Sequence, residues 1–181
     1  MRFDTLALVG QPISLTDLRS HLRIDPPDEA SPRDTALLAM LAGAVQLAQG
    51  YTGTALCAQQ MRVFDTLPAD AIRLLLPMRC DSVETLSLLI DGVWQVQDPA
   101  SVSITALGGY SAAHFAPATG AGAIELTIQT PAQSLDDGTR SALLLIVANL
   151  ERNAGDAEGF DPLTPAVRQL LQPRKLDWSA A

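Results

Sequence analysis

Apolar residues recur at helical spacing in four stretches of the chain, and each stretch has a recognisable start or end. Ser14 can cap the first helix and Ser31 the second, because a serine hydroxyl accepts a hydrogen bond from the first turn. Thr139 or Asp137 can cap the third helix in the same way. The predicted helices span residues 14–24, 33–52, 139–153 and 164–172.

Between residues 58 and 130 the pattern changes to the alternation that is typical of strands. Asp91 and Gly92 separate two β-prone runs, and Asp-Gly favours a two-residue hairpin turn. The predicted strands are 59–65, 71–76, 83–90, 93–96, 101–105 and 123–129.

Helices and strands thus occupy separate blocks of the sequence, which predicts an α+β fold. We expect the N-terminal and C-terminal helices to pack as a small helical bundle with a central antiparallel β-rich insertion. The length of 181 residues suits one domain, which we place at residues 1–172. Residues 173–181 are short and mostly polar, and we expect them to form a flexible tail.

The second helix ends in Gly50-Tyr51-Thr52-Gly53. We expect Gly53 to take a left-handed conformation and end the helix. Gly50 would allow a neighbouring backbone to approach closely, with Tyr51 packed beside it. A Gly-x-x-Gly loop can also clamp a nucleic-acid backbone, but no cation lies nearby in the sequence and the loop follows a helix end. This role is therefore excluded.

The formal net charge of −8 comes from 12 basic and 20 acidic residues. A chain without excess cations will not bind DNA broadly through its phosphates, although it could line a passage to which DNA must not adhere. No apolar stretch approaches the roughly 18–20 residues of a membrane span, and no secretory signal is present, so we expect no membrane contact. Cys57 and Cys80 have no Cys-x-x-Cys spacing, which predicts two reduced, partly buried thiols.

The sequence contains little that could support catalysis. His21 and His114 have no neighbouring cysteine and no nucleophile elbow, and there is no phosphate-binding glycine loop. The acidic residues between 156 and 161 do not match the spacing of a calcium loop. We therefore predict no catalytic residue, no metal site and no cofactor.

Four segments in order resemble the head–tail connector, or adaptor, family of tailed bacteriophages and phage-derived gene transfer agents. They are PISLTDLRSHLRID (12–25), GYTGTAL (50–56), LLLP (74–77) followed by SVETLSLLIDG (82–92), and SALLLIVANLERN (141–153). The resemblance covers nearly the whole chain.

This resemblance implies a structural protein rather than an enzyme. It implies a homo-oligomeric ring, a dodecamer in the particle, that sits under the portal protein and extends the DNA channel without sequence-specific binding. The ring would be the docking platform for the next neck or tail protein. The protein would be made in the bacterial cytoplasm and reside in the neck of a virion or phage-like particle.

The family's C-terminal segments dock on the portal. In this chain the resemblance implies portal contacts by Arg168, Arg174, Lys175, Leu176 and Trp178. A tryptophan in a polar terminus is a favoured interface anchor, and packing against the chain's own last helix would explain Trp178 equally well. The alternatives for the whole protein are another neck protein, either a stopper or a tail terminator, and a small cytosolic enzyme of unknown class.

Overall fold

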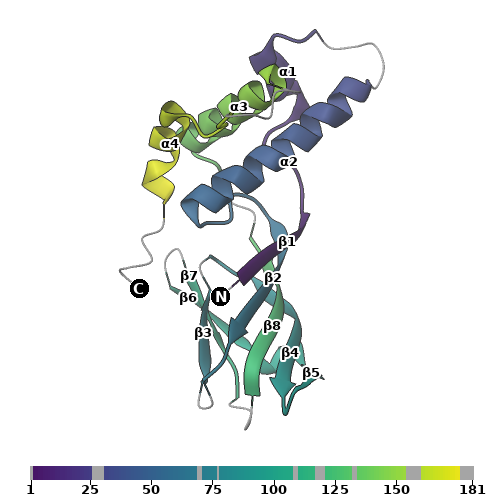
Figure 1. Ribbon diagram of the computed structural model, residues 1–181, viewed down its shortest axis with the longest axis vertical. Helices are drawn as coiled ribbons and strands as arrows, with labels where there is room; N and C mark the ends of the chain where they lie inside the picture. The colour runs from purple at the N-terminus through teal and green to yellow at the C-terminus, as the bar shows by residue number, and fades with distance from the viewer. Residues whose placement is uncertain are drawn as a thin grey trace. The chain divides into compact units, whose positions relative to one another are not determined.

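The computed structural model describes residues 2–25, 31–68, 71–76, 78–107, 110–116, 121–131, 134–153 and 160–175. The contacts divide the chain into two compact units (Figure 1). A β unit contains residues 1–10 and 57–133, and a helical unit contains residues 11–56 and 134–181. The α+β class is confirmed, and among the described residues the four α-helices lie in one unit and the two sheets in the other. The domain boundary expected after residue 172 stays a prediction.

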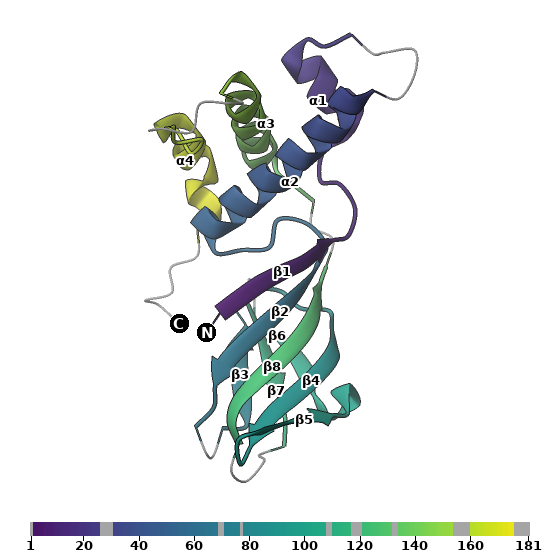
Figure 2. The same cartoon turned by 45° about the vertical axis from the view of Figure 1, so that its right-hand side comes forward.

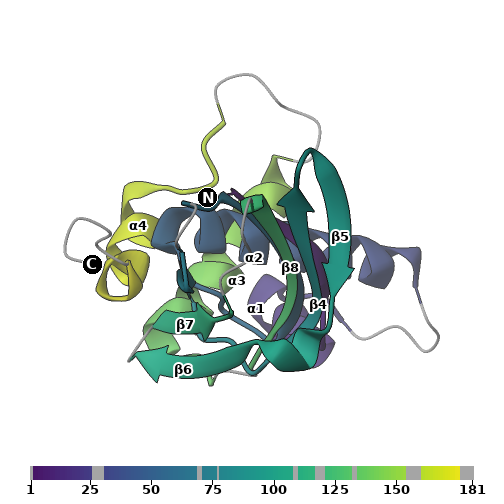
Figure 3. The same ribbon diagram turned by 90° about the horizontal axis from the view of Figure 1, so that it is seen from below.

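The β unit holds two antiparallel sheets (Figures 2 and 3). The larger sheet has the strand order β1-β2-β8-β4-β5, and the smaller has the order β3-β7-β6. The larger sheet consists of β1 (Arg2–Leu8), β2 (Gln59–Thr66), β8 (Ala121–Thr130), β4 (Ser82–Ile90) and β5 (Val93–Gln97). The smaller consists of β3 (Arg73–Leu76), β7 (Tyr110–His114) and β6 (Ser103–Leu107), and a short 3₁₀ turn, η1 (Pro99–Ser101), precedes β6.

The register of the larger sheet explains its buried face. Val63 of β2 pairs with Leu126 of β8, which pairs with Leu86 of β4, so the three side chains form one row across the sheet. All three are buried, and so are Met61 and Ile128 in the adjacent row. The alternation read in the sequence therefore places one face of each central strand in the core.

Strand β1 was not predicted. It pairs with β2, with Phe3 opposite Val63, and its ladder has an irregularity between Thr5 and Ala7. The β-rich middle is therefore not the whole of the sheet, because the N-terminus supplies one edge strand. Most of β1 is half-buried or exposed, so its sequence carries only a weak alternation signal.

The predicted hairpin turn is confirmed between β4 and β5. Asp91 has φ 50° and Gly92 has φ 78°, the two positive angles of a type I′ turn. Both cysteines are free and buried, as predicted. Burial is the main reason that the pKa of the Cys80 thiol is raised to about 11.

The helical unit contains α1 (Leu15–Leu22), α2 (Pro32–Thr52), α3 (Asp137–Arg152), α4 (Pro165–Leu171) and the 3₁₀ turn η2 (Gln172–Arg174). Ser14 caps α1 and Ser31 caps α2, as predicted, and Ser31 and Asp34 form a reciprocal capping box. The predicted cap of α3 is wrong by one residue or more: the Asp136 side chain accepts from the Thr139 backbone N–H at 2.8 Å. An aspartate three residues before Thr139 reaches this donor better than Asp137 does.

The core of the helical unit lies among α1, α2, α3 and α4, and α2 contacts each of the other three helices. Its fully buried apolar side chains include Leu18, Leu37, Val45, Leu143, Ile146, Val147, Val167 and Leu171. Ion pairs connect the helices. Arg19 of α1 pairs with Asp34 of α2 through a 3.0 Å contact, and Arg140 of α3 pairs with Asp17 of α1 at 2.7 Å.

Candidate partner-docking site

The C-terminal segment that we expect to dock starts at α4, and capping and burial set the orientation of this helix. Thr164 caps the helix by accepting from the Val167 backbone N–H, and Pro165 occupies the first position. Val167 and Leu171 are fully buried, whereas Arg168 is exposed. The Arg168 guanidinium pairs with Asp161 at 2.6 Å.

After α4, the turn η2 contacts the last turn of α2. The Tyr51 hydroxyl donates a 2.9 Å hydrogen bond to Oε1 of Gln172. The Lys175 ammonium lies 5.1 Å from the centroid of the Tyr51 ring, within the range of a cation–π interaction. Tyr51 therefore contacts Gln172 and Lys175 of the C-terminal segment.

Arg174 extends the same contact region to the start of α3. Its Nε lies 2.6 Å from Oδ2 of Asp136, and a terminal nitrogen donates to the Ser134 carbonyl at 3.2 Å. The Thr139 backbone N–H, followed by the Thr139 hydroxyl and Arg174, lowers the pKa of Asp136 to about 2. Asp136 therefore both caps α3 and holds the C-terminal segment.

Of the five predicted docking residues, the structure brings Arg174 and Lys175 together beside the ends of α2 and α3. Arg168 lies on α4 with its own acidic partner. Leu176 and Trp178 lie outside the described residues. The described part of the expected tail, residues 173–175, makes specific contacts with the helical unit, and the docking role of all five residues stays a prediction.

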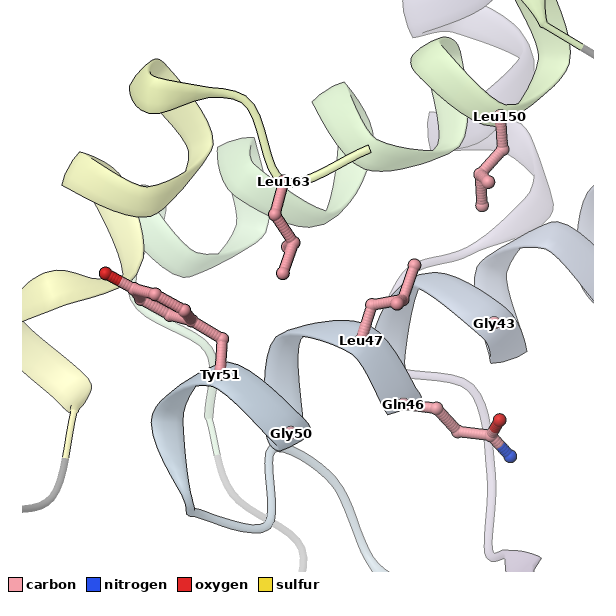
Figure 4. Close-up of a pocket in the computed structure, with 7 residues that line it drawn as sticks. All are labelled: Gly43, Gln46, Leu47, Gly50, Tyr51, Leu150 and Leu163. Atoms are coloured by element: carbon pink, nitrogen blue, oxygen red, sulfur yellow. The ribbon is translucent and has the colours of Figure 1, made fainter. Parts of the chain in front are cut away.

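An apolar groove lies next to Tyr51 (Figure 4). It has a volume of about 580 Å³ and is lined by Gly43, Gln46, Leu47, Gly50, Tyr51, Leu150 and Leu163. Leu47 and the two other leucines point toward the same space, from α2, from α3 and from the segment before α4, whereas the Gln46 amide turns away. The four large apolar side chains of the lining are half-buried.

The groove corrects the expected role of Gly50. A Cβ at Gly50 or at Gly43 would meet nothing within 4 Å, so no neighbouring backbone approaches either glycine. Instead, both leave open space at the groove. The signal that could have indicated this groove is the spacing of Gly43, Leu47 and Gly50, because residues four and seven apart share one face of a helix.

A second apolar surface lies in the β unit, on edge strand β5. Val93, Trp94 and Val96 are 62%, 46% and 81% exposed, respectively. An exposed apolar edge strand is unusual, because the edge strands of natural sheets usually carry charged residues, proline or bulges that prevent pairing with another chain. The register places Trp94 and Val96 on the face opposite the buried Leu86 and Leu88.

The part of the chain that the structure describes contains no cluster of three or more His, Cys, Asp or Glu side chains suited to a metal ion. Within the same residues, no helix combines the length and the apolar character needed to cross a membrane.

The fold is shared with solved structures of gene transfer agent (GTA) particles. One such chain comes from the "Neck of empty GTA particle computed with C6 symmetry", with a TM-score of 0.72. Chains from the "Virion of native gene transfer agent (GTA) particle" and the "Neck of native GTA particle computed with C12 symmetry" have TM-scores of 0.66 and 0.65. In each comparison the match covers 98% of this chain and 96% of the other, at 21% sequence identity.

This likeness confirms, at the level of the fold, the resemblance to phage-derived neck proteins that the sequence indicates. No protein-family model matches the chain, and a search of curated proteins found no match either.

Proposed function

We propose that this protein is a structural component of the neck of a phage-like particle, where it forms a ring under the portal as a head-to-tail adaptor. The observation that carries the proposal is the match of the whole fold, over 98% of this chain, to a chain in GTA necks. The ring would extend the DNA channel and give the next neck or tail protein a docking platform. The protein would act without turnover.

The symmetry of the neighbours supports a ring. The two neck structures were computed with C6 and C12 symmetry. A cyclic ring larger than a dimer needs two different surfaces on each subunit, because each subunit contacts its two neighbours through different faces. The larger sheet has two different edges, β1 and β5, and exposed apolar side chains on β5 suit a surface that a neighbouring copy covers.

The charge supports a channel that DNA can traverse. At −8, the chain lacks the cations needed to hold phosphates, and acidic walls would repel the DNA backbone. The C-terminal segment is the part of the chain that would dock on the portal. Its described cations, Arg168, Arg174 and Lys175, lie on or after the last helix, next to the two residues we expect to reach the portal.

The proposal is tested by mixing the purified protein with its portal alone, without other neck proteins, and imaging the mixture by negative stain. An adaptor adds a ring of density to the end of the portal, whereas a stopper or tail terminator leaves the portal bare. The chain cut after Pro173 is the test of docking by the C-terminal segment, and equal binding by both forms would exclude that role. A Val96→Asp variant that folds normally but no longer forms the ring would assign β5 to the contact between copies.

A further inference from the structure

We infer that the free protein forms a two-fold symmetric dimer, in which strand β5 of one copy pairs antiparallel with β5 of a second copy. The inference concerns the protein in solution, without a portal. Only its consequence for a ring, given below, rests on the proposed function.

Strand β5 lies at one edge of the larger sheet (Figures 2 and 3) and has none of the features that prevent pairing with another chain. Its five residues, VWQVQ, include no charged residue and no proline, and its ladder with β4 has no irregularity. Among the described residues, β4 is the only strand that pairs with it. The opposite edge strand, β1, carries Arg2, Asp4 and a ladder irregularity. Of the two edges, β5 is therefore the one open to a further strand.

The hairpin determines which backbone groups of β5 are free to pair. A two-residue turn is closed by a hydrogen-bonded pair, here Ile90 and Val93, and such pairs alternate along the ladder with pairs that exchange no hydrogen bonds. Gln95 therefore directs its backbone groups toward β4. Trp94 and Val96 direct their N–H and C=O groups away from β4, toward the open edge.

One register of two copies matches both these backbone groups and the side chains. With Gln95 opposite Gln95 of the second copy, Trp94 of each copy lies opposite Val96 of the other, and each such pair can exchange two backbone hydrogen bonds. An aromatic residue opposite a β-branched residue is a favourable cross-strand pair. Centring the pairing on Trp94 would instead place Val96 opposite Gly92, and centring it on Val96 would place Trp94 opposite Asp98. The sequence of β5 is thus complementary to itself.

Burial of apolar surface favours this pairing. Trp94 and Val96 are exposed and lie on the same face of the sheet. In the dimer, two of these side chains from each copy adjoin one another, which removes apolar surface from water. The contact uses five residues from each copy, far fewer than the roughly 20–30 residues a side of a stable interface, so we expect a weak, reversible dimer.

The symmetry of the dimer limits its growth. A two-fold pair uses the same surface on both copies and leaves no such surface for a third copy. In terms of the proposed function, the dimer would cover β5 in the free protein until the portal directs the subunits into a ring.

Cysteine cross-linking tests the register. Gln95→Cys places two thiols opposite each other at a pair without backbone hydrogen bonds, where Cα atoms lie about 4.5 Å apart and a disulfide can form. Val93→Cys is the matched control on the same face of β5, but it lies opposite Gln97 of the second copy, so its two thiols would be roughly 13 Å apart. The native Cys57 and Cys80 are buried and should not react. We expect mild oxidation to convert Gln95→Cys, and not Val93→Cys, into a disulfide-linked dimer.

Sedimentation velocity over a hundredfold range of concentration tests the dimer without a cross-link. The parent should change from monomer to dimer as its concentration rises. Val96→Pro removes an outward N–H but no hydrogen bond to β4, and Val96→Asp places a charge opposite Trp94. Each should weaken the dimer at least tenfold. Leu107→Asp is the control, because it changes an exposed apolar residue on β6, an edge strand of the other sheet.

The inference is overturned if the parent stays monomeric up to its solubility limit. Oligomers larger than a dimer overturn it as well, because they need two different surfaces on each copy. Equal cross-linking of the two cysteine variants would contradict the register, and a dimer lost in Leu107→Asp but kept in Val96→Pro would contradict the strand. The cysteine pair keeps the test valid if the Val96 variants fail to fold. Because no portal is present, the outcome is independent of the test of the ring.

Discussion

Tyr51 and Gln172 lie 121 positions apart in the sequence, and the Tyr51 hydroxyl donates a 2.9 Å hydrogen bond to the Gln172 side chain. Tyr51 belongs to the last turn of α2, and Gln172 opens η2. Together with the Lys175 ammonium over the same ring, this contact connects the end of the first long helix to the C-terminal segment. The sequence predicted both the helix end and the segment, but not that they meet.

A double-mutant cycle of Tyr51→Phe and Gln172→Ala measures this connection. Each single variant should lose about 0.5–1 kcal/mol of unfolding free energy, in the lower part of the usual range because the contact is exposed. The double variant should lose less than the sum, with a coupling of about 0.5 kcal/mol. Urea denaturation followed by circular dichroism gives all four values, and strict additivity would show that the hydrogen bond contributes nothing.

Substitutions of the two glycines at the end of α2 should change the stability of the protein in opposite directions. Gly53 has φ 72°, so Gly53→Val should destabilise the protein by about 1–2 kcal/mol, since a side chain strains the left-handed conformation. Gly50 is helical with open space around it, so Gly50→Ala should stabilise by about 0.5–1 kcal/mol. At this chain length each kcal/mol moves the melting temperature by about 2–4 °C. A shift of both variants in the same direction would contradict the assignment.

Local chemistry made much of this fold predictable. Ser14 and Ser31 cap their helices and Gly53 ends α2, because each acts on backbone within one turn of itself. The Asp91-Gly92 turn was predictable for the same reason, since its two positive φ angles depend only on the two residues themselves.

Contacts between distant residues were not predictable in this way. Strand β1 is a strand because β2 lies beside it, and residues 2–8 alone carry too weak a pattern to show this. The groove beside Tyr51 needs side chains from α2, α3 and the segment before α4, and no single stretch contains that information. Gly50 illustrates the difference. The sequence predicts that its missing side chain lets a neighbouring backbone approach, but the structure has open space at this position.

The hairpin turn between β4 and β5 gives a matched pair of variants. Gly92→Ala should destabilise the protein by about 1 kcal/mol, because alanine is strained at a φ of 78°. An added Cβ meets nothing within 4 Å, so backbone strain is the only cost. Asp91→Asn should change stability by less than about 0.5 kcal/mol, since Asn-Gly forms the same turn. Thermal unfolding checks both, and equal melting temperatures for Gly92→Ala and the parent would argue against the type I′ turn.

Asp136 should make the stability of the protein depend on pH below about 4. Its pKa is about 2 in the folded protein, against an ordinary value of 3.8, with the Thr139 backbone N–H as the largest cause. Folding therefore favours the ionised form, so this contribution is complete above pH 4 and is lost as the pH falls toward 2. The Asp136 side chain is 51% exposed, and solvent screening reduces the effect to about 1 kcal/mol.

Asp136→Asn tests this directly, because asparagine keeps an acceptor for the Thr139 N–H but cannot carry the charge. The variant should be less stable than the parent at pH 6, and the difference should shrink as the pH falls from 4 to 2. Asp137→Asn removes a carboxylate one position along and serves as the matched control. Urea midpoints measured at pH 6, 4, 3 and 2 compare the three proteins. Parallel curves for the parent and Asp136→Asn would mean that the carboxylate of Asp136 does not hold Arg174 and the start of α3 together.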